Sequence, residues 1–200
     1  LTVKAQALKK VRVAAAPKLC DSVTKQMSHL QMGSAQIELN FEDLPFEQWN
    51  KVGSTKIELM YKPSAQMTAR PLRKIASGGE VSRVMLACKV VLGESDVCDT
   101  LVFDEVDAGV GGATAVALAE VLAQLAKTHQ VIVVTHLPQV AVMASKQYVV
   151  SKTEEHNALP ITSLTEVSGT QREEEIARML SGSITEASLA HAHELLSEVR

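Results

Sequence analysis

TLVFDE at residues 100–105 and QVIVVTH at residues 130–136 are two apolar runs that each end in groups able to do chemistry. Their apolar residues are continuous rather than alternating, which is typical of parallel strands buried on both faces. A helical pattern at residues 113–127 lies between the runs, and another at 79–92 precedes the first. Strands that alternate with helices in this way predict an α/β fold with a mostly parallel sheet flanked by helices.

The ends of these two strands are where a ligand is expected, because open α/β sheets bind ligands beyond the carboxyl ends of their strands. Asp104 and Glu105 follow one strand, and His136 follows the other. If the strands are neighbours, the three side chains meet at one edge of the sheet. An acidic pair after a buried strand is typical of nucleotide hydrolysis, in which one carboxylate holds Mg²⁺ and the next activates water. The alternative is that Asp104 and Glu105 only terminate the strand, which explains one strand end but not both.

Residues 77–80 (SGGE) stand at the start of the helix expected at 79–92. Ser77 and Glu80 have the spacing of a capping box, so a structural role accounts for these two side chains. It does not account for Gly78 and Gly79, because glycines at a helix start are costly unless something approaches the backbone closely. Bare N–H groups and a hydroxyl at a helix N-terminus also form a phosphate site, and the two roles are compatible.

The N-terminal part of the chain predicts one long helix followed by two strands. Apolar positions at helical spacing run through residues 1–31, where Pro17 is expected to kink or split the helix near Ala16. This helix is either packed on the body of the protein or the end of a coiled coil. Alternating residues at 35–41 and 57–61 predict an antiparallel pair of strands.

The C-terminal part predicts two further strands and two helices. The strands are expected at residues 147–152 and 161–167. The spacing at residues 170–173 predicts a capping box that opens a helix ending at Gly182. A final amphipathic helix is expected over residues 186–199.

Composition narrows the class of protein. The 200 residues are 46% hydrophobic and 22% charged, as in packed globular chains and unlike disordered ones. A net charge of −3 excludes a uniformly basic nucleic-acid coat but permits a local basic patch. No apolar run approaches the ~18–20 residues of a membrane span. Three cysteines without metal-ligand spacing favour a cytoplasmic protein, with Cys88 as a small core residue.

Four motifs occur in one order along the chain: residues 77–80 (SGGE), 101–105 (LVFDE), 107–112 (DAGVGG) and 134–136 (VTH). They resemble the signature motif, Walker B strand, D-loop and switch histidine of an ABC-type ATPase head. The longer stretches at 75–87, 104–112, 135–141 and 172–180 resemble the RecN DNA-repair family, whose members are relatives of the chromosome-maintenance (SMC) ATPases. The resemblance runs from about residue 70 to the C-terminus, and more loosely through the N-terminal helix.

The resemblance implies a role for each reactive group at the strand ends. Asp104 would coordinate Mg²⁺ through water, and Glu105 would be the catalytic base for hydrolysis of ATP. His136 would contact the γ-phosphate and sense its loss. The chain is thereby expected to be part of an ATPase.

The resemblance also implies a second copy of the protein. Ser77, Gly78 and Gly79 would bind the γ-phosphate of a nucleotide held by another head, across a head-to-head dimer. Asp107 and the glycines after it would lie at that interface. Arg83 could be interfacial or a surface salt-bridge partner, and we expect the salt bridge.

A P-loop is absent from this sequence, because none of its ten glycines stands in the frame G-x4-G-K-[ST]. In the family the P-loop belongs to an N-terminal lobe that a coiled-coil arm separates from this one. The chain, which begins LTVK without an initiator Met, is therefore expected to be the C-terminal half of a split head. Residues 1–32 would be the end of the arm and residues 33–200 the C-terminal lobe. We expect no ATPase activity from the chain alone.

DNA is the partner that the family implies, in recombinational repair of double-strand breaks at the nucleoid. Candidate phosphate contacts are the basic side chains Lys56, Lys62, Arg70, Arg73 and Lys74, although most such charge runs are merely solvated. A RecA recombinase partner follows from the family alone. Two features depart from the family pattern, namely residues 61–67 (YKPSAQM) in place of an Asn-Pro-Gly-Glu-like turn and Pro17 in the arm.

Two other functions compete with the repair ATPase. A transport-type ABC subunit usually continues its signature with Gln and its Walker B strand with Glu-Pro-Thr, whereas Val81 follows SGGE and Val106 follows Glu105 here. A non-catalytic module would use nucleotide only to dimerise and clamp DNA. The presence of Glu105 and His136 argues against the loss of hydrolysis.

Overall fold

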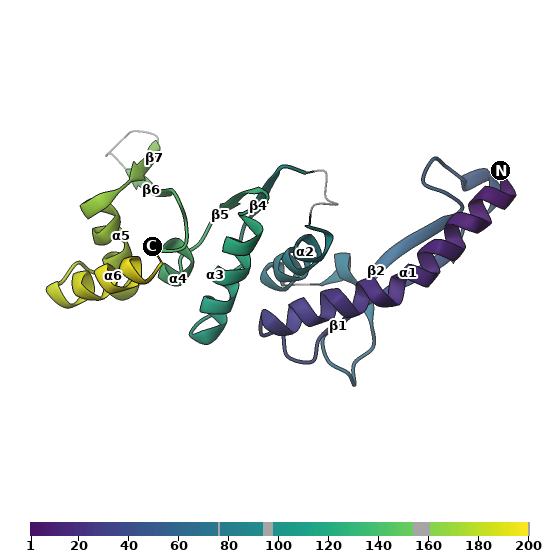
Figure 1. The fold of residues 1–200 in the computed structure, drawn as a ribbon, viewed down its shortest axis with the longest axis horizontal. Coiled ribbons are helices and arrows are strands. Elements are labelled where there is room, and N and C mark those ends of the chain that lie inside the picture. Colours follow the sequence, from purple (N-terminus) through teal and green to yellow (C-terminus); the bar gives the residue numbers. More distant parts are fainter. Residues whose placement is uncertain (76, 94–97, 154–160, 200) are drawn as a thin grey trace. The chain divides into compact units, whose positions relative to one another are not determined.

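A computed structural model describes residues 1–75, 77–93, 98–153 and 161–199. The chain forms two compact units, the first made of Leu1–Gly109 and Leu125–Val133, the second of Val110–Gln124 and Val134–Arg200. Figure 1 labels the secondary structure of both. In chain order the elements are α1 (Thr2–His29), β1 (Gln36–Asp43), η1 (Phe46–Gln48), β2 (Thr55–Lys62), β3 (Arg70–Pro71), η2 (Leu72–Lys74), α2 (Gly78–Leu92), β4 (Thr100–Phe103), α3 (Ala113–Leu125), β5 (Gln130–Val133), α4 (Pro138–Ala141), β6 (Gln147–Thr153), β7 (Ile161–Val167), α5 (Gly169–Ser181) and α6 (Glu186–Glu198).

An antiparallel sheet in the order β1–β2–β3 forms the outer part of the first unit. The alternation in the sequence predicts this pairing for β1 and β2, and the structure confirms it. Ile37 lies opposite Tyr61 in the register, and both side chains are buried. Helix α1 packs against β1 and α2, and whether it also ends a coiled coil stays a prediction.

Helix α1 continues through Pro17, so the expected split does not occur. A proline removes one backbone hydrogen bond, and packing on either side can hold the helix together in spite of that loss. Two of the three buried residues of α1, Val23 and Met27, follow the proline, and the third, Ala16, directly precedes it. Before the proline, Val3 and Val11 are largely exposed.

Polar contacts attach the half of α1 that precedes the proline. The Lys9 Nζ atom lies 2.6 Å from Asp43 Oδ2 at the end of β1. The Arg12 guanidinium donates a hydrogen bond of 2.7 Å to the Val52 carbonyl oxygen in the turn before β2.

Strands β4 and β5 are parallel neighbours, with Phe103 opposite Val133 in the register. This is the arrangement that the two apolar runs predict. The expectation of burial on both faces is wrong for these strands, because Leu101 and Phe103 are buried whereas Val102 is 65% exposed. In the part of the chain that the structure describes, only one face of this pair is covered.

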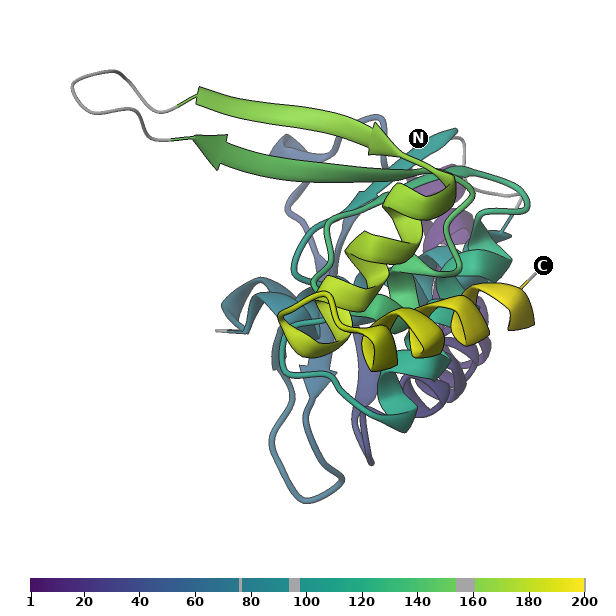
Figure 2. The same cartoon turned by 90° about the vertical axis from the view of Figure 1, so that its left-hand side faces the viewer.

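The second unit contains β6 and β7 as a separate antiparallel pair, which Figure 2 shows as a long two-stranded ribbon. The α/β class is confirmed, but among the described strands the parallel pairing is limited to β4 and β5. Val150 and Leu164 face each other in the β6–β7 register, and each is 67% exposed.

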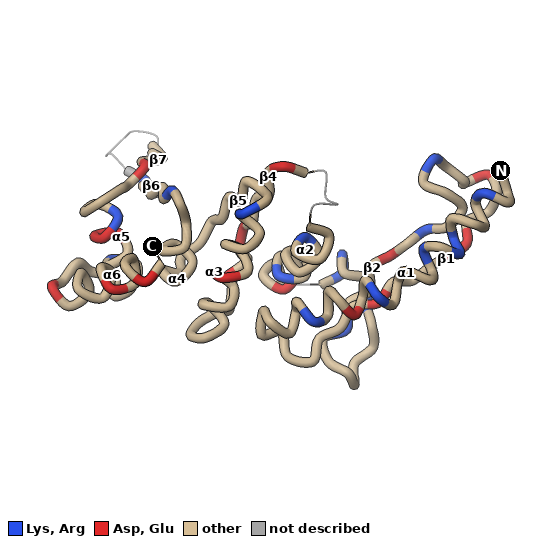
Figure 3. The backbone as a smooth tube through the Cα atoms, viewed as in Figure 1, with Lys and Arg blue, Asp and Glu red and all other residues tan. Residues whose placement is uncertain are grey.

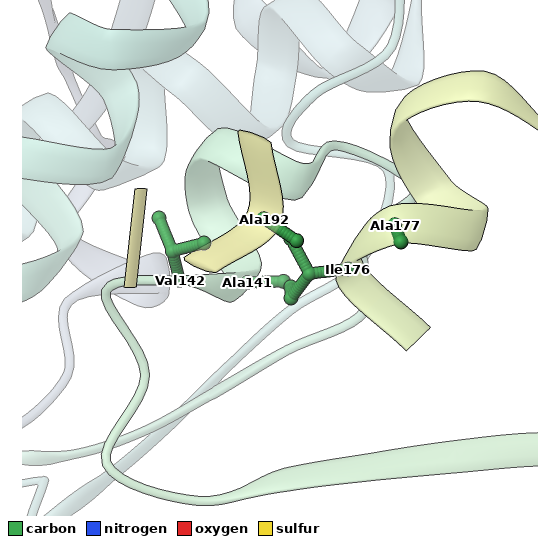
Figure 4. Close-up of a cluster of buried hydrophobic side chains, with 5 residues drawn as sticks. All are labelled: Ala141, Val142, Ile176, Ala177 and Ala192. Atoms are coloured by element: carbon green, nitrogen blue, oxygen red, sulfur yellow. The ribbon is translucent and has the colours of Figure 1, made fainter. Parts of the chain in front are cut away.

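Short helix α4 and helices α5 and α6 build the core of the second unit. Figure 4 shows the buried cluster that these helices share, made of Ala141, Val142, Ile176, Ala177 and Ala192. Among the described helices, none combines the length and the apolar character that crossing a bilayer requires.

The ends of α5 and α6 test the predicted caps. The capping box at residues 170–173 is wrong, because α5 begins at Gly169 with Ser168 as its N-cap residue. Gly182 ends α5 in the left-handed conformation, with a φ of 77°, as predicted. A capping box between Thr185 and Ser188 opens α6.

Candidate functional site

The N-terminus of α2 carries the SGGE sequence at the surface of the first unit. Ser77 caps the helix, since its Oγ atom accepts a hydrogen bond of 3.4 Å from the Glu80 backbone N–H. Ser77 and Gly78 are exposed, whereas Gly79 is buried. The Ser77 half of the predicted capping box is therefore confirmed, and among the described contacts no return bond from the Glu80 side chain accompanies it. Ser77 and Gly78 are accessible from solvent.

Gly79 is the point at which another part of the chain approaches α2 most closely. A Cβ atom at this position would lie 2.9 Å from the Ala108 Cβ atom and 3.0 Å from the Ala108 carbonyl oxygen. It would also lie 3.2 Å from the Glu105 carbonyl oxygen. The close approach that two glycines predict is thus made, at Gly79, by the backbone of the same chain.

Gly78 has a different neighbour, the carboxylate of Glu105. A Cβ atom on Gly78 would lie 2.6 Å from the Glu105 Oε2 atom. The Glu105 side chain therefore reaches the first turn of α2, where backbone N–H groups and the helix dipole favour negative charge. The candidate base and the signature turn are adjacent in one unit of the molecule.

Glu105 has a backbone φ of 55°. This is the left-handed region, which residues other than Gly, Asn and Asp seldom adopt. Glu105 is the second residue after β4, and both Asp104 and Glu105 are exposed. A turn continues from this point, in which the Ala108 N–H donates a hydrogen bond of 3.0 Å to the Glu105 carbonyl oxygen.

Two polar side chains of α2 hold the backbone of residues 104–108. The Ser82 hydroxyl donates a hydrogen bond of 3.0 Å to the Asp104 carbonyl oxygen. The Arg83 Nη1 atom donates to the carbonyl oxygens of Val106, at 3.3 Å, and Ala108, at 3.0 Å. The predicted surface salt bridge of Arg83 is wrong, because its guanidinium binds backbone carbonyl groups instead.

The middle of this segment points inward. Val106 is fully buried, and Asp107, which the resemblance assigns to a dimer interface, is only 3% exposed. Ala108 and Gly109 are exposed. In this structure, the accessible surface of the segment is therefore formed by Asp104, Glu105 and the residues after Asp107.

The end of β5 carries the third predicted group. His136 is exposed and lies three residues beyond the last residue of β5, in the second unit. The Thr135 Oγ1 atom accepts a hydrogen bond of 3.0 Å from the Leu137 N–H, which shapes the turn that carries the imidazole. The meeting of His136 with Asp104 and Glu105 stays a prediction.

Asp104 and Glu105 suit the magnesium ion that an ATPase requires. Mg²⁺ takes oxygen ligands and is usually bound by one or two carboxylates together with waters and substrate phosphates. Both carboxylates are accessible at the end of β4. Among the described residues there is no group of three or more His, Cys, Asp or Glu side chains that could hold a metal ion by itself.

The basic stretch proposed for DNA contact is partly engaged within the first unit. The Arg73 Nε atom lies 2.6 Å from Glu58 Oε1, and this hydrogen bond lowers the pKa of the Glu58 carboxyl. Arg70 and Lys74 are exposed. Figure 3 shows Lys and Arg residues interspersed with Asp and Glu residues along α1, β1 and β2 of the same unit.

The cysteines fall into two environments. Cys88 is half-buried on α2, where burial raises the pKa of its thiol to about 11. The prediction that Cys88 is a small core residue is therefore confirmed only in part, because its side chain is half-buried rather than fully buried. Cys98, by contrast, is exposed.

Sequence reasoning missed the roles of Ser82, Arg83 and Arg172. The Arg172 Nη2 atom donates to the carbonyl oxygens of Ala141, Val142 and Ala144, at 3.1, 3.1 and 2.7 Å. It thereby fastens α5 to the end of α4. The sequence signal for Arg172 was a charged residue in an amphipathic helix, which shows that the side chain could form a polar contact but not with which partner.

Comparison with known proteins adds an independent line of evidence. No protein-family model matches the sequence. The chain is 40% identical over 207 residues to the DNA repair protein RecN of Streptomyces coelicolor, a match that covers 98% of this chain and 36% of that protein. It is 43% identical over 192 residues to DNA repair protein RecN of Deinococcus radiodurans, covering 96% of this chain and 33% of that protein. The chain thus spans about a third of the length of these curated relatives.

Solved structures show the same fold at low sequence identity. The Smc head domain with a coiled coil and joint from Pyrococcus yayanosii matches with a TM-score of 0.58 and 18% identity, over 86% of this chain and 30% of that one. A structure from work on the ATP-driven dimerization and DNA-stimulated activation of SMC ATPases matches with a TM-score of 0.52, over 86% of this chain and 98% of that one. The fold is that of an SMC-type head, and the chain belongs to the RecN family of DNA repair proteins.

Proposed function

We propose that this chain provides the water-activating carboxylates and the signature turn of an ATP-hydrolysing head in a DNA-repair protein. One observation carries the proposal: the exposed turn at Ser77 and Gly78 lies beside the exposed Glu105 carboxylate in one unit of the molecule. The RecN relatives and the SMC-type fold support the same conclusion from outside the site.

Glu105 is the proposed general base. Its exposed carboxylate can accept a proton from a water molecule that attacks the terminal phosphate. Asp104, one residue earlier, would hold Mg²⁺ through water. When bound, Mg²⁺ would neutralise the charge of the phosphate oxygens. His136 would contact the terminal phosphate from the loop after β5.

Ser77 and Gly78 are proposed to bind the terminal phosphate of a nucleotide carried by a second copy of the protein. The backbone N–H groups of the first turn of α2 and the Ser77 hydroxyl are the donors that a phosphate requires. Gly79 is proposed to support the same turn without binding phosphate, because its lack of a side chain permits the close approach of residues 105 and 108.

The remaining parts of a complete ATPase are proposed to lie elsewhere in the whole protein. We infer that residues 1–32 are the end of a coiled-coil arm and that residues 33–200 form the C-terminal lobe of the head. The side chains of Val102 and Ile132 are largely exposed on one face of β4 and β5, and this apolar face suits a P-loop lobe of the same protein as its cover.

The test is ATP hydrolysis by the full-length protein that contains this chain, with Glu105→Gln as the variant. Hydrolysis should fall by at least about 100-fold, because a positioned general base contributes roughly 10²–10⁴-fold to a rate. Glu174→Gln is the matched control, since Glu174 is an exposed carboxylate on α5 in the other unit. Its hydrolysis should be unchanged.

Two results would overturn the proposal. Full hydrolysis by the Glu105→Gln variant would remove Glu105 as the base. A full-length protein that dimerises with ATP on DNA without hydrolysing it would instead be a nucleotide-gated clamp.

DNA binding is proposed for the basic stretch around β3. Charge reversal of Arg70 and Arg73 should weaken DNA binding by the full-length protein and reduce its dependence on salt, because fewer phosphates are neutralised. Charge reversal of Arg178, which pairs with Glu175 on α5, is the control. Unchanged DNA affinity in the Arg70 and Arg73 variant would place the DNA contact on another surface.

A further inference from the structure

Hydrogen bonds from α2 hold the backbone of residues 104–108 at every second carbonyl group. The carbonyl oxygen of Asp104 accepts from Ser82, and those of Val106 and Ala108 accept from Arg83. Both donors belong to the first half of α2, so this segment and the signature turn are attached to the same helix.

Glu105 needs such support, since its backbone is in a conformation that is unfavourable for a glutamate. A non-glycine residue in the left-handed region costs about 1 kcal/mol or more and persists only where its surroundings impose it. The φ of Glu105 is 55°. Ser82 bonds the peptide group before it, and Arg83 bonds the carbonyl group of the next residue, Val106. Residues on α2 therefore determine the direction in which the Glu105 side chain leaves the backbone.

Resting on the proposed function, we propose that Arg83 is a positioning residue for ATP hydrolysis that orients the Glu105 carboxylate through the carbonyl groups of Val106 and Ala108. Arg83 touches neither phosphate nor attacking water in this proposal. Ser82 supports the same segment from its other end through a single hydrogen bond. The pair connects the turn proposed to bind one nucleotide to the base proposed to act on another.

Arginine suits this task because its guanidinium presents several N–H donors in a fixed plane. One nitrogen of Arg83 serves two carbonyl oxygens that are two residues apart. A lysine at this position has a flexible point charge and holds two acceptors less rigidly. An alanine would leave both carbonyl groups without this donor.

The experiment is a double-mutant cycle on ATP hydrolysis by the full-length protein, using Arg83→Ala, Glu105→Gln and the combination. Arg83→Ala should lower kcat by roughly 10–100-fold, because small errors in the placement of a catalytic group have effects of this size. The KM for ATP should change by less than about threefold, since substrate binding does not involve Arg83. In the Glu105→Gln background, removal of Arg83 should add no further loss, because the group that it orients has already been removed.

Arg12→Ala is the matched control, since Arg12 also donates its guanidinium to a backbone carbonyl group, that of Val52, but away from residues 104–108. It should leave kcat unchanged. Arg83→Lys should recover part of the activity lost in Arg83→Ala. Thermal unfolding of each variant provides the measure of folding.

The outcomes separate this inference from the function on which it rests. If Glu105→Gln hydrolyses ATP normally, the proposed function fails, whatever Arg83 does. If Glu105→Gln is inactive and Arg83→Ala retains full kcat, the function stands and the positioning role is wrong. An equal loss from Arg83→Ala in both backgrounds, or a loss that appears in KM alone, would also contradict the positioning role.

Discussion

Each unit of the molecule uses one arginine to fasten a segment that follows a strand, and the two arginines differ in where they act. Arg83 in the first unit holds the carbonyl groups of Val106 and Ala108, directly after the residue proposed as the base. Arg172 in the second unit holds the backbone from Ala141 to Ala144, which lies beyond α4 and several residues after His136. The chemistry of the contact is the same in both places.

The two sites differ in how far the bonded carbonyl groups lie along the chain from a reactive residue. This separation decides whether such a contact affects the reaction or only the fold. Arg83 acts on a strained turn that carries a reactive side chain, so its loss should appear in the rate of hydrolysis. Arg172 ties α5 to the buried cluster around Ala141 and Val142, so its loss should appear in the stability of the fold.

The largest expected effect on stability comes from Arg172→Ala. Three carbonyl groups would lose a charged donor, and hydrogen bonds to charged groups contribute about 1.5–3 kcal/mol. The free energy of unfolding, measured by urea denaturation, should fall by roughly 2–3 kcal/mol. Arg178→Ala on the same helix should change it by less than about 0.5 kcal/mol, because Arg178 is half-exposed and pairs with Glu175 only one turn away on that helix. Equal losses from both variants would break the comparison.

Gly79→Ala should come next. Its added Cβ atom would clash with the Ala108 Cβ atom and with backbone oxygens, so the segment held by Arg83 must shift at a cost of about 1–3 kcal/mol. Gly78→Ala meets only the end of the flexible Glu105 side chain, which can swing aside, and should cost less than about 1 kcal/mol. Denaturation of the two variants tests this order. A larger loss from Gly78→Ala would show that residues 105–108 do not pack on α2 as described.

The Cys88 thiol gives a smaller, pH-dependent effect on the helix that carries Arg83. Its pKa is raised from 9.0 to about 11 by burial, so the folded protein keeps the proton at a pH where the unfolded chain has lost it. Stability should therefore decline as pH rises through that window, by an amount that Cys88→Ala removes. Urea denaturation at several pH values checks the slope, and identical slopes in both proteins would contradict it.

The smallest expected effect is on the rate of thiol labelling at neutral pH. This rate tests directly whether Arg83 acts only on residues 104–108 or on the fold of the first unit. Cys98 should react quickly because it is exposed, whereas Cys88 should react slowly. In the Arg83→Ala variant, Cys88 should stay slow if α2 remains packed and only the 104–108 segment loosens. Fast labelling of Cys88 in that variant would show that Arg83 is needed for the fold itself.

The sequence predicted those parts of the fold that depend on local patterns. The pairing of β4 with β5 and the cap at Ser77 follow from continuous apolar runs and from a serine before two glycines, and both are present. The target of Arg83 could not be predicted, because a long side chain can reach several acceptors and the tertiary structure decides among them. The predicted start of α5 is wrong because the helix begins at Gly169 and its N-cap residue, Ser168, makes no side-chain capping hydrogen bond that local spacing could reveal.

The candidate site shows the same division between local and tertiary information. Asp104 and Glu105 were identified from their place after an apolar strand, but the left-handed backbone of Glu105 has no local signature. The continuous apolar run of β4 predicts burial on both of its faces. Such a run shows what a strand tolerates, whereas the covering of each face depends on which other segments are present.

Pro17 has a mechanical consequence for α1. A proline cannot donate to the carbonyl group of Val13, so resistance to bending is lowest at this point of the helix. It separates a half anchored by buried side chains from a half attached through Lys9 and Arg12. A force applied near the first residues would bend α1 at Pro17 before it disturbed the part that follows. Bending at the proline would thereby protect the buried contacts of Val23 and Met27.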